Sequence, residues 1–318
     1  MLSEPSIDKQ SLCAQLGHLF GLIVTGLSFV PKGEESWSYR VDCDDQARYF
    51  LKIQHISPPS RDVLDFVGQL RQKGHLDEVV CPLPTLSGEP LFFFAGYSSM
   101  LFEFIDAPSL ADSCPSSGQL FRVGETLARI HACVDVRAGC PTVERFQIPF
   151  EGEYAGLMRA VKASRQNLRA DQSRVAGLLR SSEKKLDDRF EQLRTGRQRL
   201  QGRDLELVVC HGEPSPGNVL VSADRVHFVD WNTVILAPRE RDLVFFLEPE
   251  YQAVLDGYWS VTNPRFLADA VVSFYRRHWM LGEIVYFGSR LLFSDSPDTQ
   301  IERDTALFLQ ALAELDVC

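Results

Sequence analysis

The stretch from Val208 to Leu243 reads VVCHGEPSPGNVLVSADRVHFVDWNTVILAPRERDL. A first apolar run leads to a polar segment with His211, Glu213 and Asn218, and a second apolar run leads to Asp230. Short apolar runs that end in polar residues are typical of buried strands followed by loops. A carboxylate that meets a hydroxyl, beside an amide oxygen and a second carboxylate that hold Mg²⁺, suits transfer of a phosphoryl group.

The spacing within this stretch matches a known catalytic loop. Glu213 and Asn218 are five positions apart, like the base and the metal-binding Asn of the kinase loop H-R-D-x-x-x-x-N. Asp230 then stands where the metal-binding Asp of D-F-G would stand. One position departs from the template, because the base is Glu instead of Asp.

The length and composition of the chain are those of an ordinary globular protein. The chain has 318 residues, 45% hydrophobic and 24% charged, enough for one large two-lobed domain or two smaller ones. The sequence contains neither a long uncharged apolar run nor an apolar N-terminal segment, so we expect no membrane span and no signal peptide. Its 8 cysteines are scattered without zinc spacing, which predicts reduced thiols in a cytoplasmic protein.

The net charge of −10 is unevenly distributed. Residues 153–203 contain 13 Lys and Arg against 6 Asp and Glu, whereas residues 248–318 contain 11 acids against 5 Arg. An acidic C-terminal part favours cationic ligands, with a merely solvated acidic surface as the alternative. The basic stretch has few aromatic residues, so we expect no nucleic-acid partner. The oligomeric state stays open and is compatible with a monomer.

Hydrophobic periodicity predicts a mainly β N-terminal part and a mainly α remainder. Helices are expected at 8–20, capped by Asp8 or Ser11, and at 61–72, then from residue 110 to the end around the stretch quoted above. His131 ends an apolar helical stripe, which favours a core histidine over a ligand. Strands are expected at 22–30, 38–43, 48–53, 91–98 and 99–105.

A lysine in a strand that otherwise looks buried is a second sign of a phosphate site. Lys52 lies among apolar residues in RYFLKI, and a buried ammonium group is costly unless it finds an anion. Phosphate oxygens would serve, and the alternative is a lysine on the solvent side of an edge strand. In the helix that follows, Asp62 is our choice for the acid that orients this lysine.

Two further segments are candidates for nucleotide contacts. The hairpin at 31–36, which ends at Ser36, either lays backbone N–H groups over a triphosphate or is an ordinary turn. The strand that precedes the connector at 106–108 lies where a kinase hinge would bind adenine through backbone groups. By register, we expect these contacts at the C=O of Glu103 and the N–H of Ile105.

In order and spacing, these motifs resemble the aminoglycoside phosphotransferase and choline kinase group, which phosphorylates small molecules. The resemblance covers nearly the whole chain, and its segments are FLKI at 50–53, LFEFIDAPSL at 101–110, GETLARIH at 124–131, CHGEPSPGNVLV at 210–221, FVDW at 228–231 and APRERDL at 237–243. It implies an α+β, two-lobed protein-kinase-like fold. The small, mainly β N-lobe at 1–104 would bind nucleotide, and the large, mainly α C-lobe at 105–318 would hold the catalytic loop, the metal site and the substrate cleft.

The resemblance also implies roles for the nucleotide and metal residues. Lys52 would bind the α- and β-phosphates of ATP or GTP, and the loop at Ser36 would cover them. Asn218 and Asp230 would hold Mg²⁺.

On the catalytic loop, Glu213 would accept the hydroxyl proton or orient the hydroxyl. His211 would brace the loop, and Arg241 with Asp242 would be structural. The chain departs from the family at 213, where relatives have Asp, and at Ser215, where relatives often have His.

The Glu at position 213 leaves three interpretations open. Its reference pKa is only about 0.4 units above that of Asp, so it can still accept a proton. If the backbone stays in place, the extra methylene moves the carboxylate by about 1–1.5 Å, and such a displacement can cost about 10²-fold in rate. The chain is then a working enzyme with a shifted loop, an impaired enzyme, or a nucleotide-binding pseudoenzyme. The presence of Lys52, Asn218 and Asp230 favours the first.

We therefore expect a Mg²⁺-dependent O-phosphotransferase that acts on a small cationic antibiotic, an aminoglycoside or an aminocyclitol such as spectinomycin, and confers resistance. Glu248, Glu250 and Glu283 are the expected substrate contacts. The alternatives are a metabolic kinase for an amino alcohol, sugar or amino acid, and the pseudoenzyme.

Overall fold

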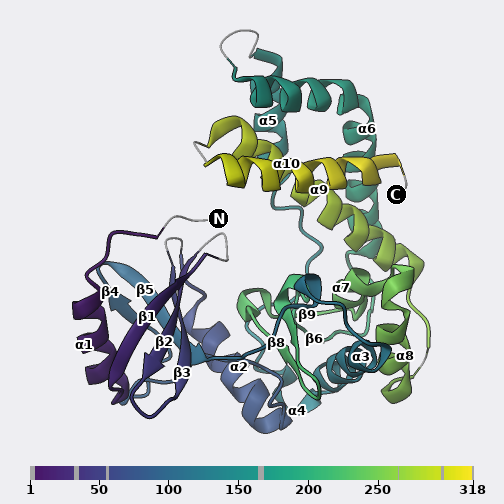
Figure 1. The fold of residues 1–318 in the computed structure, drawn as a ribbon. Helices are drawn as coiled ribbons and strands as arrows, with labels where there is room; N and C mark the ends of the chain where they lie inside the picture. Colours follow the sequence, from purple (N-terminus) through teal and green to yellow (C-terminus); the bar gives the residue numbers. More distant parts are fainter. Residues whose placement is uncertain are drawn as a thin grey trace. The chain divides into compact units, whose positions relative to one another are not determined.

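A computed structural model describes residues 4–31, 36–54, 57–163, 168–263, 265–294 and 297–316. The chain divides into two compact units, one made of Met1–Val143 and Glu206–Arg265, the other of Glu144–Leu205 and Phe266–Cys318 (Figure 1). This division differs from the lobe boundary at 104/105, which stays a prediction.

The first unit contains an antiparallel five-stranded sheet in the order β1-β2-β3-β5-β4. Its strands are β1 (Val24–Val30), β2 (Ser36–Cys43), β3 (Arg48–Gln54), β4 (Phe92–Phe94) and β5 (Tyr97–Glu103). The turn between β4 and β5 lies earlier than the break that we predict after residue 98. Ala95 and Gly96 form it, and both have positive φ angles.

Helix α1 (Lys9–Phe20) covers one face of this sheet. Asp8 caps the helix, as predicted, and its carboxylate accepts backbone N–H groups of the first turn. The buried Leu12 belongs to the same core cluster as Ile53 of β3. Because successive side chains along a strand point to opposite faces, Lys52 lies on the face away from α1.

The helices of the first unit include one pair packed at backbone contact. The unit contains α2 (Arg61–Gly74), α3 (Ser117–His131), α4 (Val134–Arg137), α7 (Glu240–Leu243) and α8 (Gln252–Val261). A side chain on Gly124 of α3 would overlap the carbonyl oxygen of Val254, and one on Gly257 of α8 would overlap that of Phe121. The glycines therefore allow α3 and α8 to approach closely.

Two short antiparallel strand pairs complete this unit. Strand β6 (Val208–Cys210) pairs with β9 (Ile235–Ala237), and β7 (Val219–Val221) pairs with β8 (Val226–Phe228). The backbone N–H of Phe228 donates to the C=O of Glu78 at 2.7 Å, and the N–H of Val80 donates to the C=O of Phe228 at 3.0 Å. The segment after α2 thus fixes the end of β8, immediately before the turn that carries Asp230.

The second unit is helical in the residues that the structure describes. It contains α5 (Glu151–Ala163), α6 (Ala170–Leu200), α9 (Asp269–Phe293) and α10 (Asp298–Ala313), and α9 packs against both α6 and α10. Asp304 of α10 is buried and pairs with Arg290 of α9 at 3.1 Å.

The antiparallel N-terminal sheet and the helical C-terminal region confirm the predicted α+β class. Within the described ranges, no helix combines the length and the apolar character that a bilayer crossing needs.

Candidate active site

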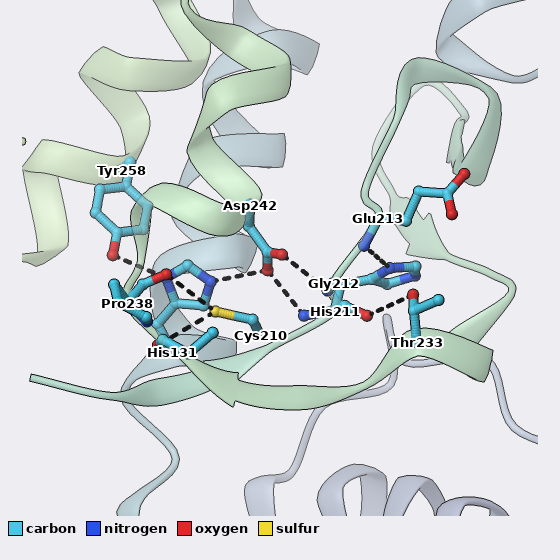
Figure 2. A network of polar contacts seen from close by, with 10 residues as sticks. His131, Cys210, His211, Gly212, Glu213, Thr233, Pro238, Asp242 and Tyr258 are labelled. Carbon is cyan, nitrogen blue, oxygen red and sulfur yellow. Dashed lines mark hydrogen bonds and ion pairs between the residues drawn. The ribbon is translucent and has the colours of Figure 1, made fainter. Parts of the chain in front are cut away.

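The buried carboxylate of Asp242 holds the loop that follows β6 (Figure 2). Its two oxygens accept hydrogen bonds from the backbone N–H groups of His211 and Gly212, both at 2.8 Å. Burial alone would raise the pKa of Asp242, but hydrogen bonding and charge from His131, with the contributions of His211 and Gly212, outweigh it and lower that pKa. An ionised carboxylate therefore fixes the backbone before Glu213.

His131 connects this carboxylate to helix α8. Its Nε2 lies 3.0 Å from Oδ2 of Asp242, and its Nδ1 lies 2.8 Å from the hydroxyl oxygen of Tyr258. Side-chain atoms of His131, Cys210 and Asp242 lie within 4.8 Å of one another, but hydrogen bonds already engage them. This confirms the core-histidine interpretation. The sequence could not show the contacts, because the partners of His131 lie 111 and 127 positions away.

Four hydrogen bonds form a closed ring in the loop that contains Glu213 and Asn218. The N–H of Glu213 donates to Nδ1 of His211 at 3.3 Å, and Nε2 of His211 donates to the C=O of Val229 at 2.9 Å. The N–H of Val229 donates to the C=O of Asn218, and Nδ2 of Asn218 donates to the C=O of Glu213, both at 3.0 Å. Burial lowers the pKa of His211, so its imidazole is neutral and can both accept and donate.

Gly212 packs closely against the backbone of Thr233. Its φ of +92° lies in the left-handed region, and a Cβ there would overlap the carbonyl oxygen of Thr233. The hydroxyl of Thr233 donates to the C=O of His211 at 3.2 Å. The backbone before Glu213 is therefore held by Thr233 as well as by Asp242.

Lys52 of β3 contacts the candidate metal-binding carboxylate directly. Its Nζ lies 2.9 Å from Oδ1 of Asp230, and the two side chains are 18% and 38% exposed. Asp230 itself has a left-handed backbone, with φ at 66°, in the turn after β8. The structure thus brings together two of the residues that the sequence assigns to nucleotide and metal binding.

The donor atoms beside this ion pair suit Mg²⁺. Asn218 uses its Nδ2 for the hydrogen bond to Glu213, so its side-chain oxygen is the atom left to meet a cation. The carboxylate of Asp230 offers further oxygens. Amide and carboxylate oxygens, completed by water and phosphate, are the ligands that Mg²⁺ takes in nucleotide sites. The residues present therefore fit the ion.

Two other residues predicted to act at this site are Ser36, the candidate phosphate contact, and Asp62, the candidate acid for orienting Lys52. Ser36 is the first residue of β2, pairs with Gln54 and is 3% exposed, while residues 32–35 of the predicted phosphate loop lie outside the described residues. Asp62 lies exposed in the first turn of α2, and the ion pair of Lys52 is with Asp230. The predicted roles of Ser36 and Asp62 stay predictions.

The candidate adenine and substrate contacts lie in three different segments. Glu103 ends β5, with its carboxylate 3.3 Å from a guanidinium nitrogen of Arg71, and Ile105 follows two positions later. Glu248 and Glu250 are exposed in the first unit. Glu283 is half-buried on α9 of the second unit. Their roles also stay predictions.

Both the sequence and the fold are similar to those of known proteins. The model of the phosphotransferase enzyme family matches residues 26–279. Protein StrN of Streptomyces griseus is 28% identical over 278 residues, which cover 83% of this chain and 79% of that protein.

Two solved structures have the same fold. Spectinomycin phosphotransferase in complex with ADP and spectinomycin matches with a TM-score of 0.80 at 19% identity over 98% of each chain. Segments 210–243 and 275–292 of this chain also resemble that enzyme in sequence. A microcompartment-associated aminopropanol kinase matches with a TM-score of 0.60 at 14% identity over 97% of each chain.

The family match spans most of the chain, and it includes Lys52, the loop with Glu213 and Asn218, and Asp230. It confirms both the resemblance inferred from the motifs and the prediction of a phosphotransferase. The chain belongs to the phosphotransferase enzyme family.

Proposed function

We propose that this phosphotransferase moves the γ-phosphoryl group of ATP or GTP onto a hydroxyl of a small cationic antibiotic, an aminoglycoside or an aminocyclitol, and thereby confers resistance. One observation carries the proposal. Lys52 and Asp230 lie 2.9 Å apart, and hydrogen bonds link the turn of Asp230 to the loop with Glu213 and Asn218. Phosphoryl transfer depends mainly on such positioning and on charge neutralisation.

Each of these residues has a defined task in the proposed reaction. The ammonium group of Lys52 binds the α- and β-phosphate oxygens, and the oxygens of Asn218 and Asp230 hold Mg²⁺, which neutralises phosphate charge when bound. Glu213 orients the acceptor hydroxyl and takes its proton as the oxygen attacks the γ-phosphorus. Adenine would bind the backbone groups of Glu103 and Ile105.

The charge of the chain supports a cationic acceptor. Residues 248–318 have 11 acids against 5 Arg, and the proposed contacts Glu248, Glu250 and Glu283 belong to this part. Spectinomycin phosphotransferase has been solved with ADP and spectinomycin. An intracellular donor such as ATP, together with scattered thiols, fits the cytoplasmic location that we propose.

The experiment is a screen with mass detection of a product that has gained one phosphate. The panel contains aminoglycosides, spectinomycin and peptide antibiotics, each with ATP or GTP and Mg²⁺. We expect turnover of at least one cationic antibiotic. Turnover restricted to amino alcohols, sugars or amino acids would replace the resistance function by a metabolic one.

A metabolic amino alcohol kinase is the second candidate, because an amino alcohol is also cationic and the aminopropanol kinase has the same fold. The pseudoenzyme requires a different result. Mg-ATP would raise the melting temperature while no acceptor on either panel gains phosphate.

A further inference from the structure

Hydrogen bonds and a close backbone contact hold the backbone around Glu213 in place. Both backbone polar groups of this residue are engaged, its N–H with Nδ1 of His211 and its C=O with Nδ2 of Asn218. Before it, Asp242 binds the N–H groups of His211 and Gly212. The carbonyl group of Thr233 lies against Gly212, so the loop is blocked on that side as well.

These contacts oppose the shifted loop, one of the alternatives that the sequence leaves open for Glu213. A shifted loop would break hydrogen bonds to two buried groups, His211 and Asp242. Each buried partner left unpaired would destabilise the shifted loop. Figure 2 shows the carboxylate of Glu213 pointing away from the buried network. The extra methylene therefore extends the side chain outward instead of displacing the loop.

We infer that Glu213 sets the reach of the active site. The acceptor hydroxyl is held about 1–1.5 Å farther from the loop backbone than an Asp at this position would hold it. The inference rests on the proposed function. Glu213 thereby selects acceptors whose reactive hydroxyl stops short of the loop, because bulk around that hydroxyl prevents a closer approach.

The proposed reaction at Glu213 forms one bond, breaks one bond and moves one proton. The acceptor oxygen forms a bond to the γ-phosphorus, and the bond from that phosphorus to the β,γ-bridging oxygen breaks. The hydroxyl proton passes to the carboxylate of Glu213 and then to solvent, and the nucleoside diphosphate leaves with its electron pair. A shorter side chain would leave the carboxylate out of hydrogen-bond reach of the hydroxyl.

The test compares wild-type protein with Glu213→Asp in structure and in rate. Crystal structures of both, with Mg²⁺ and a non-hydrolysable ATP analogue, show whether the backbone of 211–218 stays in place while the carboxylate retracts. Phosphate transfer to the acceptor found in the screen is measured beside ATP hydrolysis, in which water is the acceptor. Glu302→Asp is the matched control, since Glu302 is exposed on α10.

We expect superimposable loops, transfer reduced about 10²-fold and nucleotide affinity unchanged. Hydrolysis should fall much less, because water can follow the retracted carboxylate. A loop that moves in the Glu213→Asp variant, so that the shorter side chain places its carboxylate where the wild type has it, would overturn the inference, and so would transfer at the wild-type rate. If wild-type protein phosphorylates nothing, the proposed function fails, and the two crystal structures still decide the question of reach.

Discussion

The ammonium nitrogen of Lys52 lies 2.9 Å from Oδ1 of Asp230, so two residues with different proposed ligands bind each other. In the proposed reaction Lys52 needs a phosphate and Asp230 needs a metal ion. Binding of Mg-nucleotide would therefore exchange one ion pair for two new interactions. The pair keeps both charges compensated until the ligand arrives, and it makes the affinities for metal and nucleotide depend on one another.

Lys52→Met should affect nucleotide and metal in opposite directions. Loss of the ammonium group should weaken Mg-ATP binding at least about tenfold, a typical effect of losing a charged hydrogen-bond partner. Mg²⁺ alone should bind Asp230 more tightly, because its competing cation is gone. Isothermal titration calorimetry measures both, with Lys73→Met as the control, since Lys73 is exposed near the end of α2. Equal Mg-ATP affinity in the variant and the wild type would exclude the phosphate role.

Two substitutions at Asn218 should separate its two functions. Asn218→Asp keeps an oxygen for the metal but removes the Nδ2 donor to the C=O of Glu213. It should therefore retain Mg²⁺ binding while turnover falls. Asn218→Ala removes both groups, and its turnover should fall by at least about 10²-fold. Metal titration beside steady-state kinetics distinguishes the variants. Turnover of Asn218→Asp at the wild-type rate would show that the hydrogen bond to Glu213 contributes nothing separate.

Gly212→Ala should destabilise the first unit strongly. A methyl group there would overlap the carbonyl oxygen of Thr233, and the φ of +92° is unfavourable for any other residue. We expect a loss of at least about 2 kcal/mol in the free energy of unfolding, measured by urea titration. The control is Gly68→Ala inside α2, where a Cβ meets nothing within 4 Å, and it should gain about 0.5–1 kcal/mol. A Gly212→Ala protein as stable as wild type would show that the loop can move.

Stability should decrease as the pH falls below about 6.5, the ordinary pKa of histidine. Burial lowers the pKa of His211, so the unfolded chain takes up protons in a range where the folded chain does not. This contribution is complete above about pH 6.5 and is lost toward the lower folded pKa. Burial also lowers the pKa of His227, which acts with the same sign. The pKa of Asp242 is lowered in the folded chain, so the stability that this carboxylate contributes is lost only as the pH falls through 3.8 and below.

Urea unfolding between about pH 7.5 and pH 5 tests this dependence. His211→Gln keeps an amide donor but does not titrate, so its free energy of unfolding should change less with pH than that of the wild type. The His227→Gln variant shows how much His227 contributes to the pH dependence of the free energy of unfolding. Parallel pH curves for wild type and His211→Gln would contradict the assignment.

The sequence was informative where local chemistry decides the structure. Asp8 is followed by a regular apolar stripe and does cap α1. The strand with Lys52 has the expected limits to within one residue. The predicted position of the β4–β5 turn is wrong, because Ala95 is an unusual turn residue and its run of aromatic neighbours hides the interruption.

Contacts between distant residues could not be predicted in the same way. The motifs give Lys52 and Asp230 their proposed ligands, but nothing in the spacing shows that the two side chains meet. The link from Asp242 through His131 to Tyr258 joins three chain segments with no common pattern. Such contacts follow from tertiary packing, and a family resemblance alone gives the roles without the partners.

The first unit is interrupted in the sequence, since residues 144–205 of the second unit separate its two segments. All five strands of the large sheet are made before residue 104, so during synthesis on the ribosome this sheet can form early. The half of the site with Glu213, Asn218 and Asp230 emerges much later. The ion pair of Lys52 with Asp230 can therefore form only after most of the chain has been translated. A prematurely terminated product that lacks residues 206–265 would contain the lysine without the proposed base and the proposed metal ligands.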